Sequence, residues 1–373
     1  MVATGIWAAV DRLVDRAARP DDLRAHRIHL LAARRWRAEQ RPVPPELESA
    51  ERRAVIAALT APVLLKRVRD ACDGPLVLLK GPEVAARYPD PALRSYLDLD
   101  LLVADPRGAK RALLAAGFVP VGDPRVYEDI HHERPLAAPN LPLHVELHST
   151  PKWPDVGAAP RADELLDAAV PSALGVDGVS ALPAAHHALV LAAHSWAHSP
   201  LRRVGELVDV AVVADGAAPG ELRALAGAWG LGRIWDTTAG AVAGLLEDGP
   251  TTWPLRTWAR HLPAVRDRTV LETHLEHWLS GFSALPPGGA LAAGAGALGA
   301  ELRSAPGESA AAKLSRTRLA VRNALVRRSE HVEQVERAGV MPPVFYELGP
   351  AHAGEGRPDP DADGAGPAEG RAS

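Results

Sequence analysis

The sequence contains few cysteine, lysine and aromatic residues, and each shortage limits which kinds of protein this chain can be. Its 373 residues include one cysteine, Cys72, which excludes a disulfide framework and any iron–sulfur or multi-cysteine zinc site. Only five of the 42 basic residues are lysine and the net charge is -4, so the chain is not a polybasic nucleic-acid binder. With 9 Trp, 4 Tyr and 3 Phe, the core must consist mainly of Leu, Val and Ala.

A long membrane-spanning run is also missing. The longest uncharged stretch, residues 278–300, contains Pro286-Pro287-Gly288-Gly289 and is otherwise mostly Ala and Gly, so we predict a loop or linker there. The first twenty residues carry Asp11 and Asp15 within their apolar pattern and do not resemble a secretory signal. We therefore expect a cytoplasmic protein with no membrane contact.

Apolar spacing predicts helices over the first seventy residues. One helix is expected at 21–39, after Pro20, and another at 46–71, after a proline-rich break. The residues predicted to form the apolar stripe of the second helix are Leu47, Val55, Ala58 and Leu59.

The pattern changes at Gly74, where short apolar and alternating runs begin. Runs at 75–80, 97–103 and 141–148 predict strands, and helices are expected at 82–88 and 106–117. From Trp153 onward the sequence predicts only helices.

These patterns divide the chain into four parts. We expect an N-terminal helical region at 1–72, a core with a sheet at 73–152, and a helical domain at 153–340. Residues 341–373 are rich in Gly, Pro, Asp and Ala and predict a disordered tail.

The most informative residues are two aspartates in the run 97–103. Asp98 and Asp100 share one face of a strand, with Cα atoms about 6.7 Å apart. Their repulsion at an effective dielectric near 20 is about 2.5 kcal/mol, which a bound cation would offset. Oxygen ligands favour Mg²⁺ or Mn²⁺ over zinc. The alternative is an exposed edge strand with two solvated acids.

Further polar residues extend this pattern. Glu146 lies in the middle of the run 141–148, and three carboxylates on adjacent strands suit metal-assisted phosphoryl or nucleotidyl transfer. Lys80 and Arg94 are then candidates for holding phosphates, and Gly81 would let the backbone approach them closely.

As an ordered set, these motifs resemble the poorly characterised bacterial nucleotidyltransferases of the polymerase-β-like superfamily. The resemblance covers residues 60–150 well and extends loosely to about residue 215. The matching residues are Leu79-Lys80-Gly81, Tyr88-Pro-Asp-Pro91, Arg94, Asp98-Leu-Asp100-Leu-Leu-Val103, Gly117-Phe118 and Val145-Glu146-Leu147-His148.

The resemblance implies an α+β fold, with a small mixed sheet flanked by N-terminal helices and a C-terminal helical domain. It implies transfer of a nucleoside monophosphate from a nucleoside triphosphate, ATP being the first expectation, to a hydroxyl group, with release of pyrophosphate. The acceptor would be a small molecule, a peptide or a protein, and no long nucleic acid is expected.

The resemblance also implies roles for individual residues. Asp98, Asp100 and Glu146 would hold divalent metal, Mg²⁺ or Mn²⁺, and Glu146 would help to deprotonate the acceptor. Lys80 would hold the triphosphate with Gly81 and Arg94. The wider superfamily has Gly-Ser where this chain has Lys80-Gly81, as in the branch that it resembles.

Two other functions stay open. One is a non-catalytic nucleotide-binding or regulatory protein on the same scaffold, for which the Lys80-Gly81 pair is the argument. The other is a glycosyltransferase that binds a metal and a sugar nucleotide through Asp98-Leu-Asp100. About 25 residues precede this motif after the first strand, fewer than that fold needs.

Histidines supply the remaining candidates. His148 shares the strand face of Glu146 and could line the cleft or contact phosphate or metal, and His131, His132 and His144 are near in sequence. His194 and His198 have the spacing of a metal-binding pair on a helix, but no third ligand is evident, so packing or exposure to solvent is favoured. Arg203 and Asp209 predict a salt bridge that organises their helix.

Overall fold

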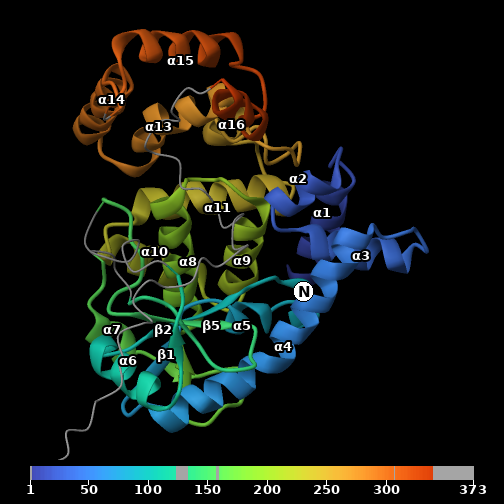
Figure 1. Ribbon diagram of the computed structural model, residues 1–373, viewed down its shortest axis with the longest axis vertical. Helices are drawn as coiled ribbons and strands as arrows, with labels where there is room; N and C mark the ends of the chain where they lie inside the picture. Colours follow the sequence, from blue (N-terminus) through green and yellow to red (C-terminus); the bar gives the residue numbers. More distant parts are fainter. Residues whose placement is uncertain (1, 123–132, 157–158, 306, 339–373) are drawn as a thin grey trace, which may run out of the picture.

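The computed structural model describes residues 2–122, 133–156, 159–305 and 307–338. Its fold is α+β, as predicted, with one mixed sheet and helices on both sides of it (Figure 1). The strands are β1 (Leu76–Leu78), β2 (Asp98–Leu102), β3 (Val119–Pro120), β4 (Leu136–Ala137), β5 (His144–His148), β6 (Val170–Pro171) and β7 (Val179–Ala181).

Helices make up most of the remaining described chain. In chain order they are α1 (Val2–Val14), α2 (Pro20–Ala25), α3 (His29–Ala38), α4 (Pro45–Ala71), α5 (Pro82–Ala85), the 3-10 turn η1 (Pro91–Leu93), α6 (Pro106–Ala115), α7 (Ala162–Asp167), α8 (Ala184–His198), α9 (Val204–Ala214), α10 (Pro219–Ala228), α11 (Gly232–Leu246), α12 (Trp253–Thr257), α13 (Val270–Ala284), α14 (Pro287–Leu302), α15 (Ala310–Arg322) and α16 (Arg328–Arg337).

The strand order is β3-β4-β5-β2-β1-β7-β6. At its centre, β2 pairs in parallel with β5 and antiparallel with β1, and β1 pairs in parallel with β7. The three predicted strands are therefore confirmed and lie side by side. The expectation of only helices after Trp153 is wrong, because β6 and β7 complete the same sheet. The sequence did not predict β7 because it is only three residues long, and Val-Ser-Ala is not a strong strand pattern.

The two faces of the sheet differ in what covers them. Leu99, Leu101, Val145 and Leu147 belong to a core shared with α4 and α6. The opposite face joins a larger core built with α8 and α9, which extend from the sheet toward the helices at the top of Figure 1. Successive strand residues alternate between these cores because side chains alternate across a strand.

The N-terminal helices depart from expectation in one place. The helix predicted at 21–39 is two helices, α2 and α3, and Arg27 between them has a φ of 57°. Tertiary contacts explain the break: the His26 carbonyl accepts a hydrogen bond from Gly205 N at 2.8 Å, and His26 Nδ1 from Val204 N at 3.3 Å.

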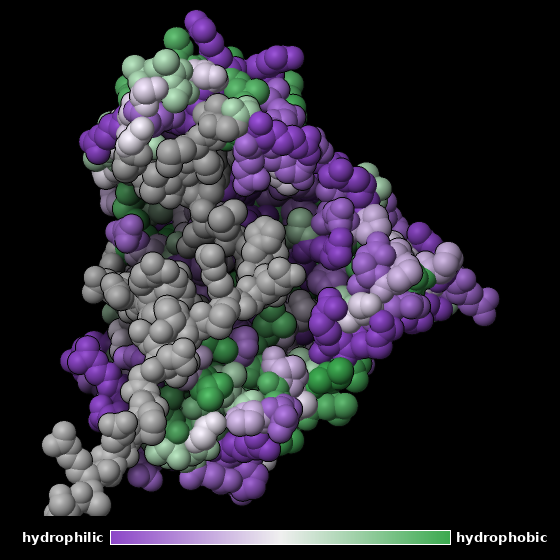
Figure 2. All heavy atoms as spheres, viewed as in Figure 1, coloured by the Kyte–Doolittle hydropathy of each residue, from purple (hydrophilic) through white to green (hydrophobic). Residues whose placement is uncertain are grey.

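The predicted stripe of α4 is partly wrong. Leu47 is buried, but Val55 is 46% exposed and Leu59 is 71% exposed, and Figure 2 shows apolar surface along the edge where α4 runs. The helix instead buries small and aliphatic residues. Ala50 and Ala54 pack with Leu30 of α3, and the residues that join the core on the apolar face of the sheet are Ala57, Ala61, Leu64, Leu65 and Val68.

The loop predicted at 278–300 is also wrong, because α13 and α14 occupy it. Pro286 lies between the two helices. Pro287 is the first residue of α14, where a missing N–H is tolerated. Glycine then allows close contact, since a Cβ on Gly281 would lie 3.2 Å from the Cβ of Ala293. The predicted tail at 341–373 and His131 and His132 lie outside the described residues.

Candidate active site

Parallel pairing of β2 with β5 brings the polar residues of the two motifs together. Asp100 is level with Glu146, Asp98 is level with His144, and His148 lies two residues beyond Glu146. Because these residues alternate with the leucines and valines of the apolar face, their side chains lie on the face toward α8 and α9.

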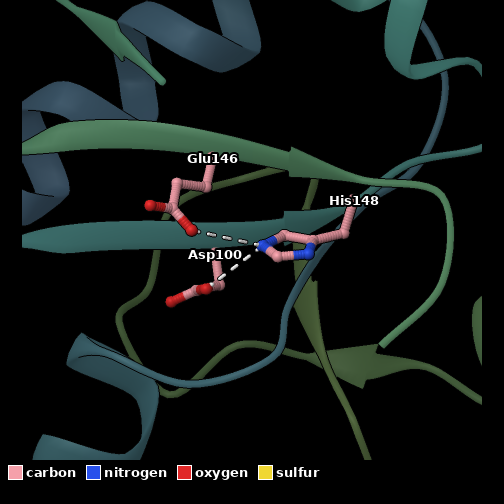
Figure 3. A group of neighbouring side chains, drawn as sticks. All are labelled: Asp100, Glu146 and His148. Atoms are coloured by element: carbon pink, nitrogen blue, oxygen red, sulfur yellow. Dashed lines mark hydrogen bonds and ion pairs between the residues drawn. The ribbon is translucent and has the colours of Figure 1, made fainter. Parts of the chain in front are cut away.

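Asp100 lies at the centre of the group. It is fully buried, and its Oδ1 lies 3.0 Å from the ammonium Nζ of Lys80. Nε2 of His148 donates to the same oxygen at 3.1 Å and lies 3.7 Å from Oε2 of Glu146 (Figure 3). One ligand atom from each of Asp100, Glu146 and His148 lies within 4.8 Å of the others.

The pKa values of the two aspartates of β2 are shifted in opposite directions. Burial raises the pKa of Asp98, the carboxylate of Asp100 raises it further, and the result is about 6. Burial also disfavours ionised Asp100, but the charge of Lys80 and the hydrogen bond from His148 outweigh burial and hold its pKa well below the usual 3.8. Asp100 is thus ionised, whereas the ionised form of Asp98 is disfavoured mainly by burial, and a bound cation would stabilise it.

The donor set fits a divalent cation. Oδ2 of Asp100 is buried and has no hydrogen-bond partner among the described residues, so one carboxylate oxygen is left for a ligand. The carboxylates of Asp100 and Glu146 suit Mg²⁺ or Mn²⁺. Because Nε2 of His148 donates to Asp100, we interpret His148 as the residue that orients this carboxylate. Asp98 lies on the same strand face but outside the three-residue group.

The turn after β1 is held close to β2. Gly81 has a φ of 64°, and a Cβ there would lie 3.0 Å from the carbonyl oxygen of Asp98. Any other residue would strain the backbone and press on β2. Glycine therefore fixes the turn that carries Lys80, which is a reason for its presence that the sequence did not reveal.

Arg94 has partners other than the expected phosphates. Its Nε and one terminal nitrogen donate to the two carboxylate oxygens of Asp209, both at 2.8 Å, and its other terminal nitrogen donates to the Gly81 carbonyl at 3.0 Å. Tyr88 also donates to Asp209, at 2.7 Å. This buried network, centred on Arg94 and Asp209, links α9 to the turn at Gly81.

The salt bridge expected of Arg203 and Asp209 is wrong, because each has another partner. Arg203, the residue before α9, pairs with Glu206 at 3.1 Å, whereas Asp209 pairs with Arg94. The partner of Asp209 is 115 residues away, so only the fold identifies it.

A contact between a lysine after β5 and the histidines of α8 was not predicted. Lys152, which follows β5, lies with its Nζ 3.0 Å from Nδ1 of His198 on α8, and the rings of His194 and His198 are 4.6 Å apart. The only sequence signal for Lys152 is the rarity of lysine in this chain.

Acidic residues aligned on adjacent strands beside a lysine suit an enzyme that transfers phosphorus-containing groups. The profile of the uncharacterised nucleotidyltransferase family matches residues 21–240, more than half of the chain. The chain belongs to this family, and it is a transferase of that class.

The matched region runs from α2 into α11 and includes every strand of the described sheet. Comparison with curated proteins finds no significant match. Among the described helices, none combines the length and the apolar character needed to cross a membrane.

Proposed function

We propose that the protein transfers a nucleoside monophosphate from a nucleoside triphosphate, with ATP as the first choice, to a hydroxyl group of a small molecule, peptide or protein. The acceptor oxygen forms a bond with the α-phosphorus, the bond from that phosphorus to the bridging oxygen breaks, and pyrophosphate leaves. The observation that carries the proposal is the alignment of Asp100 with Glu146 on one buried strand face beside Lys80.

In this proposal Asp98, Asp100 and Glu146 hold Mg²⁺ or Mn²⁺. The metal supplies charge neutralisation for the phosphates and lowers the pKa of a bound hydroxyl group. Glu146 is only half-buried and accepts the proton of the acceptor, while His148 keeps Asp100 in place. Burial lowers the pKa of Lys80, but the carboxylates of Asp100 and Asp98 raise it above its usual value, so its ammonium group is available to phosphate.

Gly81 and Arg94 act on the nucleotide side in different ways. Gly81 lets the turn approach the nucleotide, and Arg94 fixes that turn through the Gly81 carbonyl. We place the reaction in the cytoplasm, where nucleoside triphosphates are available.

A second candidate is a non-catalytic nucleotide-binding protein, and the contact between Lys80 and Asp100 favours it. An ammonium group 3.0 Å from Oδ1 neutralises Asp100 without a metal. The two candidates therefore differ in whether nucleotide binding depends on a divalent cation.

The test is thermal unfolding of the wild type and of the double variant Asp98→Asn/Asp100→Asn, with each nucleoside triphosphate in the presence and absence of Mg²⁺ or Mn²⁺. A ligand at 100 times its Kd stabilises the folded state by about 2.7 kcal/mol. We expect a metal-dependent rise in Tm that the double variant loses and that Asp70→Asn, an exposed change on α4, retains.

Each other outcome has a defined meaning. Metal-independent stabilisation that survives in the double variant would support the non-catalytic candidate. Stabilisation by sugar nucleotides alone would support glycosyl transfer. Once a metal-dependent shift is found, pyrophosphate release in the presence of candidate acceptors identifies the second substrate.

A further inference from the structure

The side of α4 that points away from the sheet carries an apolar seam that the rest of the described chain leaves exposed. The exposed fractions of the seam residues lie between 46% and 71%: Val55, Ile56, Leu59 and Val63. They follow one side of a 27-residue helix that runs along the outside of the sheet (Figure 1). Neighbouring large aliphatic side chains that are exposed together mark a surface that binds a partner.

The seam continues into a groove between α3 and the first half of α4. The groove has a volume of about 520 Å³, and its lining residues are Arg37, Glu48, Glu51, Arg52, Val55 and Ile56. The charged residues of this lining are paired with one another, since Arg37 lies 3.6 Å from Glu48 and 2.7 Å from Glu51. A groove that combines apolar side chains with charged ones suits an amphipathic helix.

The spacing of the seam is that of a helix packed along another helix. Ile56, Leu59 and Val63 are separated by three and four residues, which is the repeat of apolar contacts in a coiled coil. Arg52 and Lys66 occupy the next positions of the same repeat on either side. The apolar contact is therefore short, and we expect the association that it supports to be reversible.

The charges on α4 favour a second copy of the same helix running in the opposite direction. Residues 46–53 have a net charge of −1, and residues 66–70 have a net charge of +2. When Ile56 lies level with Leu59 of the second copy, each of these segments lies beside the oppositely charged segment of the other helix. A parallel pair would instead place segments of like charge together.

One pair of residues represents this complementarity. Glu46 and Arg67 lie on the same flank of the seam, are exposed, and take part in no ion pair within the described part of the chain. In the antiparallel arrangement they lie within two residues of each other's level, once at each end of the helix pair. The aliphatic part of Arg52 then lies level with Val63 of the second copy and can cover it.

We propose that a second copy of this chain covers the seam, and that the protein forms a two-fold symmetric dimer through antiparallel α4 helices. Residues 59–67 of each copy lie along the groove of the other copy. The other side of α4 packs on the apolar face of the sheet, whereas Asp100 lies on the opposite face. Both groups of carboxylates therefore face away from the interface, and the inference is independent of the proposed function.

The experiment is sedimentation velocity of the full chain at concentrations from about 1 to 200 µM, a range that brackets the expected Kd of about 10 µM for a small interface. Leu59→Glu places a charge from each copy at the centre of the seam and should raise the Kd at least about tenfold. The matched control is Leu302→Glu on α14, because Leu302 is 72% exposed and Leu59 is 71% exposed. The control should dimerise as the wild type does.

Reversal of charge tests the orientation of the helices without changing the seam. Glu46→Arg and Arg67→Glu each bring like charges together and should each raise the Kd about fivefold. The double variant Glu46→Arg/Arg67→Glu exchanges the two charges and should restore the wild-type Kd. Far-UV circular dichroism and Tm confirm that each variant is folded, and Leu59→Glu should keep any metal-dependent rise in Tm with nucleoside triphosphate that the wild type shows.

Three results would overturn the proposal. A wild type that stays monomeric up to about 200 µM would leave the seam to a different protein. A dimer that persists in Leu59→Glu would have its interface elsewhere. A dimer that depends on Leu59 but is not restored in the double variant would exclude the antiparallel arrangement.

Discussion

The two faces of the central sheet are stabilised in different ways. The face toward α4 and α6 buries Leu99, Leu101, Val145 and Leu147 in a continuous apolar core. The face toward α8 and α9 carries Asp100 and its neighbours, and there the charges are offset one by one through specific partners. The stability that the first face contributes depends on buried apolar area, which many sequences can supply. The stability of the second face depends on a few ion pairs, and removal of one partner leaves a buried charge without compensation.

The largest effect is expected at the pair that links the polar face to the helical bundle. Asp209→Asn leaves the guanidinium group of Arg94, whose side chain is 11% exposed, without its charge partner. We expect the free energy of unfolding to fall by about 3–5 kcal/mol, measured by urea denaturation. Asp215→Asn, at the exposed end of the same helix, should change it by less than about 0.5 kcal/mol. Equal effects of the two variants would show that the buried pair does not hold the bundle to the sheet.

The apolar face should respond to loss of volume. Leu101→Ala removes a fully buried side chain between the sheet and α4, and we expect a loss of about 3 kcal/mol from buried area and the cavity left behind. Leu97, just before β2, is 61% exposed, so Leu97→Ala is the control and should cost less than about 0.5 kcal/mol. A small effect at Leu101 would mean that α4 moves in to fill the space.

Acid should destabilise the protein through its buried histidines, one of which contacts the turn that carries Lys80. His187 on α8 is fully buried and donates from Nε2 to the Leu79 carbonyl at 2.8 Å, and burial lowers its pKa from 6.5 to about 4. Between these pH values the unfolded state binds a proton that the folded state does not, so stability falls as pH decreases from 6.5 to 4. The loss from this residue is about 3 kcal/mol.

The measurement for His187 is urea denaturation at a series of pH values between 7 and 4. In His187→Gln, which keeps an N–H donor for Leu79, the stability lost over this interval should be about 3 kcal/mol smaller than in the wild type. The same pH dependence in both proteins would exclude His187 as its source.

The smallest predicted effect on stability comes from a substitution at the metal site, which should weaken metal binding and leave the fold unchanged. Glu146→Gln removes one carboxylate from the face that also carries Asp98 and Asp100, and the amide keeps the size of the side chain. We expect Mn²⁺ binding, followed by electron paramagnetic resonance, to weaken about tenfold, with little change in Tm. The control Asp70→Asn should bind Mn²⁺ as the wild type does. Unchanged affinity in Glu146→Gln would remove this residue from the metal site.

The same contrast explains which parts of the molecule could be predicted from the sequence. Alternation in 97–103 and 141–148 identified the central strands and the face shared by Asp98 and Asp100, because the period of a strand is a local property. Local patterns failed where packing decided the outcome. Val55 and Leu59 were expected to be buried and are exposed, while Ala57 and Ala61 of α4 pack into the core on the apolar face of the sheet. In residues 278–300, prolines and glycines suggested a loop, but Pro287 begins a helix.

The sequence by itself determined the α+β class, the order of the motifs and the carboxylates that make the chain a candidate metal-dependent enzyme. The individual strands and helices, and the shared face of Asp98 and Asp100, follow from residues within a few positions of one another. Only the tertiary structure decided that Arg94 binds Asp209, that His148 holds Asp100, and that Lys152 approaches α8. These contacts join residues far apart in the chain, and the partner of a buried charge is set by whichever segment the fold brings within hydrogen-bond distance.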